Sequence, residues 1–135
     1  MTTEATTGSI PLQEERDIVM CRQVVRKLTQ QAKFSLVDQT KLITAASELS
    51  RNTVVYGGGG EMHWEFVQNG IRTGLRLAFE DKGPGIPDVD LALTDGWTSG
   101  KGMGVGLSGS RRLVNDFELR TVVGEGTCVT VTRWK

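Results

Sequence analysis

The sequence contains few of the residues that crosslink small proteins or hold metals. It has only two cysteines, Cys21 and Cys128, far apart in the chain, and one histidine, His63. Because a disulfide framework or a zinc site needs several such residues at paired spacings, both are excluded. We expect both cysteines to be reduced and buried. His63 has no visible partner for a metal site or a catalytic triad, so we expect it to be structural.

An excess of one charge and long apolar runs are also missing. Sixteen basic and sixteen acidic residues give a net charge of zero, so no broad positive field attracts nucleic acid or anionic lipid. No segment has the length of a membrane span, and residues 1–8 lack the basic and apolar regions of a signal peptide. We expect a cytoplasmic protein that forms a single domain over residues 1–135, is flexible at residues 1–8, and has proteins or small molecules as partners.

The first half of the chain predicts a short strand and two helices. Residues 10–13 can form an edge strand. Apolar residues then recur at steps of three and four from Ile18 to Ala32, which predicts an amphipathic helix. Ser35 is a typical N-cap for a second helix, whose apolar residues run from Leu42 to Thr53. The glycines after Tyr56 must end this helix.

The chain then predicts a hairpin and a long loop. Polar and apolar residues alternate over residues 62–66 and 71–80, which predicts two half-buried strands joined near Asn69-Gly70, a hairpin dipeptide. Residues 81–106 are rich in glycine and lack an apolar period. We expect a loop there with one helical turn near Asp90, and so long a loop is usually functional.

A third helix over residues 107–115 and two strands over 117–123 and 127–134 complete the predicted order. Such an order favours an α+β fold, an α/β sandwich with helices packed on one face of a mostly antiparallel sheet. The odd-numbered residues from Ile71 to Phe79 are expected to face those helices.

Glu48 and Asn52 lie four residues apart on the second predicted helix, so their side chains project from one side, away from the apolar stripe. A carboxylate can take a proton from an attacking hydroxyl, and an amide oxygen is a hard ligand suited to Mg²⁺ beside phosphates. Taken alone, the pair is equally typical of a solvated helix face.

Asp81 begins the segment Asp81-Lys-Gly83-Pro-Gly85-Ile86 and continues the series that should face the helices. An inward carboxylate needs a hydrogen-bond donor, and the exocyclic amine of adenine is one candidate. The alternative is that Asp81 caps the following turn. Thr127 should also point inward, beside a bound base, although a strand threonine is more often only a good β-former.

A Gly-x-Gly-x-Gly triplet stands immediately before the third predicted helix, where free backbone N–H groups meet the positive helix end. A lysine and two hydroxyl side chains just upstream can add a charge and donors for phosphates. The residues of this predicted phosphate site are Thr98, Ser99, Lys101, Gly102, Gly104 and Gly106. A Rossmann fingerprint also uses such a triplet, but here no strand runs into the glycines and no βαβ unit follows.

In this order, four segments resemble the nucleotide boxes of the GHKL (Bergerat-type) ATPase and kinase superfamily. They are Glu48-Leu-Ser-Arg-Asn52, Asp81-x-Gly83-x-Gly85, Gly102-x-Gly104-x-Gly106 and Gly126-Thr127. The resemblance covers the chain from about Ile10 to Lys135. Small size and the run Gly106-Leu-Ser-Gly-Ser-Arg-Arg-Leu-Val-Asn-Asp-Phe make the chain most similar to the serine/threonine switch kinases of the stressosome.

The resemblance implies the GHKL α/β sandwich, with ATP between the helices and a lid. Asp81 would bind the adenine amine, and Gly83, Gly85 and Ile86 would shape the base pocket. Asn52 would hold the Mg²⁺ that bridges the phosphates.

By the same resemblance, Glu48 would be the general base, and Lys101 with the glycines of residues 102–106 would form the phosphate side of the lid. Phosphoryl transfer asks a protein mainly to position groups and neutralise charge. The implied reaction moves the γ-phosphate of ATP to a protein serine or threonine.

The resemblance also implies partners. The substrates would be STAS-domain proteins of the stressosome scaffold, and the released kinase would bind and activate a PP2C-type phosphatase in a bacterial stress-signalling pathway. Two alternatives remain open. One is an anti-sigma-factor kinase, which shares the ATP boxes and sequesters a sigma factor. The other is a non-catalytic interaction module whose nucleotide only sets the lid conformation.

Overall fold

A computed structural model describes residues 6–93 and 107–135 of the chain. In chain order its elements are β1 (Thr7–Leu12), α1 (Glu15–Gln31), α2 (Leu36–Val55), β2 (Gly60–Asn69), β3 (Arg72–Asp81), α3 (Val89–Ala92), α4 (Leu107–Arg112), β4 (Asp116–Val122) and β5 (Gly126–Trp134). Over these two ranges no helix has the length and apolar character needed to cross a membrane.

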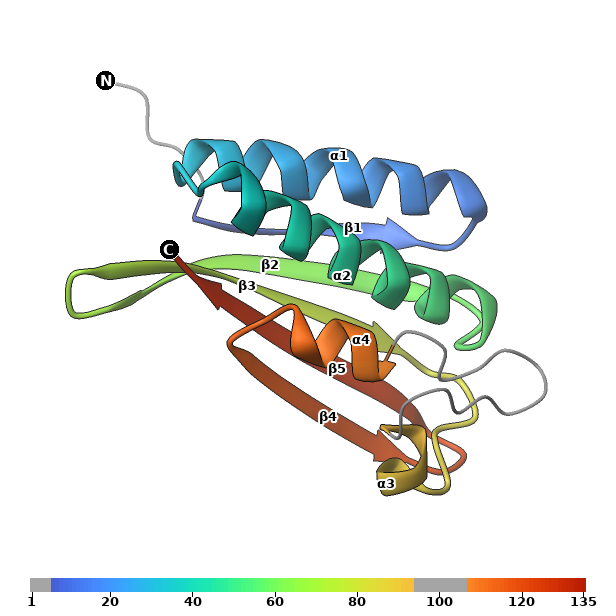
Figure 1. The fold of residues 1–135 in the computed structure, drawn as a ribbon. Helices are drawn as coiled ribbons and strands as arrows, with labels where there is room; N and C mark the ends of the chain where they lie inside the picture. Colours follow the sequence, from blue (N-terminus) through green and yellow to red (C-terminus); the bar gives the residue numbers. More distant parts are fainter. Residues whose placement is uncertain (1–5, 94–106) are drawn as a thin grey trace.

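The strands form one antiparallel sheet in the order β1-β2-β3-β5-β4. Because β5 pairs with β3, the last strand of the chain is interior and β4 lies at the edge. Helices α1, α2 and α4 lie on the same face of this sheet (Figure 1). The predicted α+β architecture, with helices on one face of an antiparallel sheet, is therefore confirmed.

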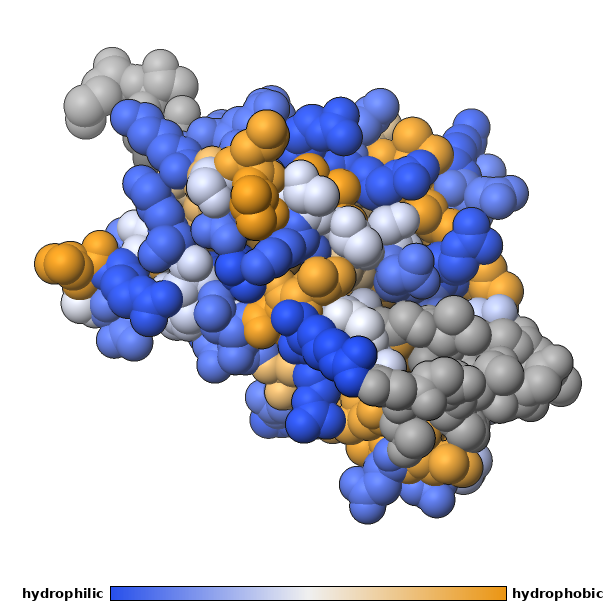
Figure 2. Space-filling view, viewed as in Figure 1, coloured by the Kyte–Doolittle hydropathy of each residue, from blue (hydrophilic) through white to orange (hydrophobic). Residues whose placement is uncertain are grey.

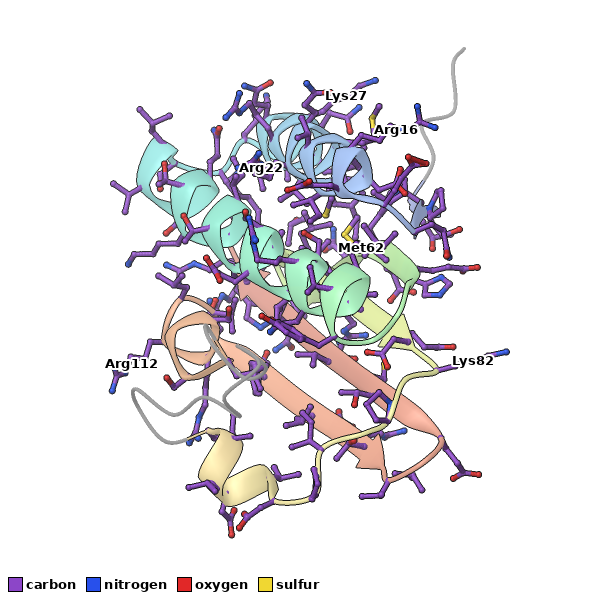
Figure 3. All side chains as sticks on the ribbon, turned by 90° about the vertical axis from the view of Figure 1, so that its right-hand side faces the viewer. Arg16, Arg22, Lys27, Met62, Lys82 and Arg112 are labelled. Atoms are coloured by element: carbon purple, nitrogen blue, oxygen red, sulfur yellow. The ribbon has the colours of Figure 1, made fainter. Side chains whose placement is uncertain are left out.

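The hydrophobic core lies between the helices and that face of the sheet. Its largest fully buried side chains include Leu12, Leu42, Leu49, Met62, Leu75, Leu77 and Phe79. The Met62 side chain lies between the helices and the sheet (Figure 3), with its Sδ 3.5 Å from the Sγ of Cys21. Burial raises the pKa of the Cys21 thiol to about 12, so Cys21 is an unionised packing residue, as predicted. Cys128 is only half-buried, so the expectation of burial is wrong for it.

The face of the molecule drawn in Figure 2 is mainly hydrophilic. Figure 2 shows the apolar side chains in separate small groups over the helices and the loops. His63 lies in β2, with its Nε2 3.3 Å from Glu61 Oε2, and both side chains are about half exposed.

Ile71 does not face the helices as the alternation predicted. It is fully exposed. Asn69 and Arg72 are the last paired residues of the β2–β3 hairpin, which leaves Gly70 and Ile71 as the two loop residues. Gly70 has a φ of +63°, a conformation that suits glycine in a tight turn. The alternating pattern therefore stops at the loop.

Two element boundaries also differ from the prediction. Thr7 and Gly8 were expected in the flexible end but belong to β1, where they pair with β2. Helix α4 ends before Asn115, because that residue joins the sheet: its N–H donates to the Thr132 carbonyl at 3.0 Å, and its side-chain oxygen accepts the Trp134 N–H at 2.7 Å.

An ion pair ties the start of α2 to β5. Ser35 caps α2 as predicted, accepting the Asp38 N–H at 3.1 Å. Arg133 Nη2 lies 2.6 Å from Asp38 Oδ1, and the two side chains are 16% and 24% exposed. Hydrogen bonding to the Arg133 guanidinium holds the pKa of the Asp38 carboxyl below its ordinary value.

We expect Asp38→Asn to lower the free energy of unfolding at pH 7 by about 2 kcal/mol, because the largely buried Arg133 charge would lose its counter-charge. Since the folded pKa is depressed, this contribution is fully present above the unfolded pKa of about 3.9 and is lost as the pH falls through the folded value. Urea titrations of wild type and Asp38→Asn at pH 7 and pH 2 measure the loss of unfolding free energy and its dependence on pH.

The matched control is Arg120→Gln, which breaks an ion pair between side chains that are 81% and 56% exposed and should change stability little. An Asp38→Asn defect of equal size at both pH values would contradict the electrostatic explanation.

Candidate functional site

A pocket lies at the C-terminal end of α2, between that helix, the sheet and the start of α4. Its apolar lining comes from Leu49, Phe79, Ile86, Leu107 and Val129. Its polar lining comes from Asn52, Thr53, Tyr56, Asp81 and Thr127. The fold thus brings together four of the predicted site residues, Asn52, Asp81, Ile86 and Thr127, from α2, β3, the following loop and β5.

Asp81 is the only acidic side chain among the described residues that line this pocket. Its Oδ1 accepts the N–H of Gly83 at 2.8 Å, so the residue caps the turn and lines the pocket at the same time. Burial raises the pKa of the Asp81 carboxyl, and the N–H groups of Gly83 and Thr127 oppose that shift. The exposed neighbour Lys82 points away from the molecule (Figure 3).

A carboxylate has about four lone-pair sites. The turn uses part of that capacity, so Asp81 can accept a further hydrogen bond from a group in the pocket. An amine on a flat apolar ring fits this combination of one acceptor and aliphatic or aromatic walls.

Gly57 and Gly83 enclose the Asp81 side chain. A Cβ added to Gly57 would lie 2.5 Å from Asp81 Cγ, and one added to Gly83 would lie 2.8 Å from Gly57 Cα. The sequence predicts Gly57 only as the point where α2 stops. Its second role, leaving room for the carboxylate, depends on a tertiary contact that the sequence does not reveal.

We expect Gly57→Ala to weaken nucleotide binding by at least about tenfold, because the added methyl group displaces Asp81 at a cost of about 1–3 kcal/mol. Calorimetric titration with ATP measures the change. Gly109→Ala is the control, since a Cβ there meets nothing within 4 Å. Equal ATP affinities for wild type and Gly57→Ala would show that the Asp81 position is unimportant.

The loop after Asp81 is hydrogen-bonded to the end of β4 and to the turn between β4 and β5. The Gly124 N–H donates to the Pro84 carbonyl at 2.8 Å, and the Ile86 N–H donates to Thr121 Oγ1 at 2.9 Å. Gly85 has a φ of +78°, and a Cβ on it would lie 2.6 Å from the Val122 carbonyl oxygen. The predicted base-pocket residues therefore rest on β4.

Sequence reasoning missed Thr121. A signal was available, because Thr121 and Thr127 flank the Gly124-Glu-Gly126 turn and would face each other in a tight hairpin. They are direct cross-strand partners, with 2.9 Å between their hydroxyl oxygens.

Asn52 and Glu48 occupy different positions relative to the pocket. Both are half-buried on α2, but only Asn52 lines the pocket. Glu48 lies one helical turn away towards the N-terminus. The carbonyl of Asn52 accepts the N–H groups of Tyr56 and Gly57, at 3.0 and 2.9 Å, which ends the helix beside the pocket.

The described residues contain no group of three or more His, Cys, Asp or Glu side chains that could hold a metal ion by themselves. A metal at Asn52 would therefore need further oxygen ligands from phosphates and water, the set that Mg²⁺ commonly uses in nucleotide sites. The donor chemistry of Asn52 fits that role.

The free space in the pocket is about 30 Å³, room for one or two water molecules. Ile86 and Leu107, both 5% exposed or less, belong to the apolar lining of this pocket. A purine needs more room than this free space, so the lining must move for a base to enter.

The predicted phosphate site lies outside the described residues. Its members are Thr98, Ser99, Lys101, Gly102, Gly104 and Gly106. Helix α4 begins at the next residue, Leu107, whose side chain lines the pocket. The chain therefore returns from this segment directly to the pocket wall.

The chain is similar to known proteins over most of its length. Residues 37–135 match the family of histidine kinase-, DNA gyrase B- and HSP90-like ATPases. The chain is 40% identical over 125 residues to the serine/threonine-protein kinase RsbT of Bacillus subtilis (strain 168). That alignment covers 93% of this chain and 94% of the relative.

Proposed function

Because the chain belongs to the GHKL superfamily of histidine kinase-, DNA gyrase B- and HSP90-like ATPases, we propose that its pocket binds the adenine ring of ATP and that its substrates are STAS-domain proteins of a stressosome scaffold. The chain is an ATP-dependent serine/threonine kinase of this superfamily. The observation that carries the base assignment is the half-buried Asp81 carboxylate between apolar walls.

In this proposal Asp81 accepts a hydrogen bond from the adenine amine, as its remaining acceptor capacity allows. Gly83 and Gly85 shape the loop, and Ile86 packs on the ring. Thr127 lies 9% exposed in the same pocket, beside the base.

Asn52 holds Mg²⁺ through its side-chain oxygen in this proposal. When bound, Mg²⁺ neutralises charge on the β- and γ-phosphates. Glu48 accepts the proton of the substrate hydroxyl as that oxygen bonds to the γ-phosphorus, while the bond from the γ-phosphorus to the β–γ bridging oxygen breaks and ADP leaves. Lys101 contributes a positive charge, and Thr98, Ser99 and the glycines of residues 102–106 contribute donors to the phosphates.

The positions of Asn52 and Glu48 on α2 support this division of roles. Asn52 lines the pocket, and Glu48 lies one turn closer to the N-terminus of the same helix, outside the pocket lining. Base recognition and proton transfer are then separate functions of two regions of the site.

We also propose that the kinase acts as a partner switch. Its similarity to the Bacillus subtilis kinase covers nearly the whole of both chains, which supports equivalent partners. Release from the phosphorylated scaffold frees the kinase to bind and activate a PP2C-type phosphatase.

The test is transfer of radiolabel from γ-labelled ATP to STAS-domain proteins of the same organism, with and without Mg²⁺. Labelled serine or threonine in a STAS protein, dependent on Mg²⁺, is the expected result. Binding of ATP without any transfer would overturn the proposed STAS-domain substrates and would favour a nucleotide-gated binding module. Capture of a sigma factor in place of the phosphatase would indicate an anti-sigma-factor kinase.

A further inference from the structure

Thr121 occupies the centre of a small hydrogen-bond network behind the pocket. Its Oγ1 accepts the Ile86 N–H at 2.9 Å, lies 3.2 Å from the Gly126 carbonyl oxygen, and lies 2.9 Å from Thr127 Oγ1. A hydroxyl has one proton to donate and two lone pairs to accept with. Three neighbours therefore use its full capacity.

The arrangement of protons follows from this count. The carbonyl of Gly126 can only accept, so the Thr121 proton goes to it. The Thr121 lone pairs then receive the Ile86 N–H and the Thr127 hydroxyl proton. Thr127, whose own proton is used in this way, has only lone pairs left to present to the pocket that it lines.

We propose that Thr121 is a positioning residue that fixes the base loop and makes Thr127 an acceptor, so that the pocket selects adenine over guanine. The inference rests on the proposed function, because it assigns selectivity to the same nucleotide site. Thr121 itself is not among the residues that line that pocket, so it acts through Ile86 and Thr127.

Two acceptors, Asp81 and Thr127, then face one end of the base. The exocyclic amine of adenine offers two N–H donors to such a pair. Guanine has a carbonyl oxygen at the equivalent ring position, which would meet only acceptors and leave them unpaired. A site built from hydrogen-bonding groups rejects a mismatched partner strongly for this reason.

Thr121 is also important for nucleotide affinity, because it contacts the loop that carries Ile86. Ile86 has a hydrogen bond to Thr121, and the preceding Gly85 packs against the Val122 carbonyl. Without the hydroxyl, the Ile86 N–H loses its partner, and only the bond between Gly124 and Pro84 still holds the loop to the β4–β5 turn, so the nucleotide must supply part of the ordering. Ordering on binding reduces the observed affinity.

Calorimetric titrations with ATP and with GTP test the proposal on three variants. Thr121→Val removes the hydroxyl at nearly constant shape, and Thr121→Ser retains it. Thr130→Val removes a hydroxyl from the same sheet, and among the described residues the Thr130 hydroxyl has only a distant partner, Cys128 Sγ at 3.9 Å.

We expect Thr121→Val to bind ATP about tenfold more weakly and to lose about fivefold in its preference for ATP over GTP, the size of one lost hydrogen bond. Thr121→Ser and Thr130→Val should match the wild type in both quantities. A merely structural role would change the melting temperature without changing the ATP to GTP ratio. Unchanged affinity and ratio in Thr121→Val would overturn the proposal.

A measurement on the wild type covers the case in which Thr121→Val fails to fold. Amide exchange without nucleotide should show the Ile86 N–H protected, and exchange at the rate of an open loop would overturn the proposal. These experiments distinguish failure of the proposed function from failure of the role of Thr121. Wild-type protein that binds no ATP overturns the proposed function, whereas normal ATP binding with an unselective pocket overturns only the role of Thr121.

Discussion

Asp81→Asn should abolish measurable ATP binding, with a loss of at least about 100-fold in affinity. The oxygen of the new amide can keep the Gly83 N–H bond, so its NH₂ group would turn into the pocket. A donor would then face the donor amine of adenine, and both would be desolvated without a partner. Calorimetric titration with ATP gives the affinity directly.

The melting temperature of Asp81→Asn shows whether the loss of ATP binding is due to misfolding. Because burial raises the pKa of Asp81, the ionised carboxylate lowers the stability of the folded protein at neutral pH, and a neutral amide should leave the melting temperature unchanged or higher. The control is Glu80→Gln, since Glu80 is the preceding strand residue, is exposed and faces the other side of the sheet. Normal ATP affinity in Asp81→Asn would remove Asp81 from the base site.

Glu48→Gln should retain ATP but slow phosphate transfer by about 100-fold or more, the usual contribution of a general base. Glu48 does not line the base pocket, so the affinity for ATP should stay within about twofold of the wild type. Single-turnover transfer of labelled phosphate to a STAS-domain protein measures the rate, and calorimetry measures the affinity.

Glu61→Gln is the matched control, because Glu61 is an exposed glutamate of β2 whose Oε2 lies 3.3 Å from His63 Nε2. It should transfer phosphate at the wild-type rate. Full activity in Glu48→Gln would mean that positioning of the phosphates alone accounts for the rate. An equal loss of ATP affinity and of rate would place Glu48 in nucleotide binding.

Much of the fold could be predicted because the signals are local. Ser35 before an apolar period marks the start of α2, and glycine after Tyr56 marks its end. Alternation of polar and apolar residues predicts the β2–β3 hairpin up to its loop. Ile71 departs from the pattern because it lies in the loop, where no paired strand residue orients its side chain towards the helices. The position of β5 between β3 and β4 is not local, since it depends on long-range pairs such as Asp81 with Thr127.

The residues of the candidate site also differ in whether local sequence signals predict them. Asp81, Asn52 and Thr127 could be predicted because each belongs to a motif of fixed spacing. Gly57 could not, because its role comes from a contact with Asp81 in a distant segment of the chain, and Thr121 was missed although the predicted hairpin offered a signal for it. Pairing β4 with β5 across the Gly124 turn would have drawn attention to Thr121, but the sequence gives no reason to bring Gly57 against Asp81.

The most direct test of the central claim is a crystal structure of the protein with Mg²⁺ and a non-hydrolysable ATP analogue. The account predicts the adenine amine within hydrogen-bond distance of the Asp81 carboxylate and Thr127 Oγ1, with Ile86 against the ring and Asn52 beside the metal. A base bound elsewhere, with Asp81 still bonded only to the N–H groups of Gly83 and Thr127, would contradict it.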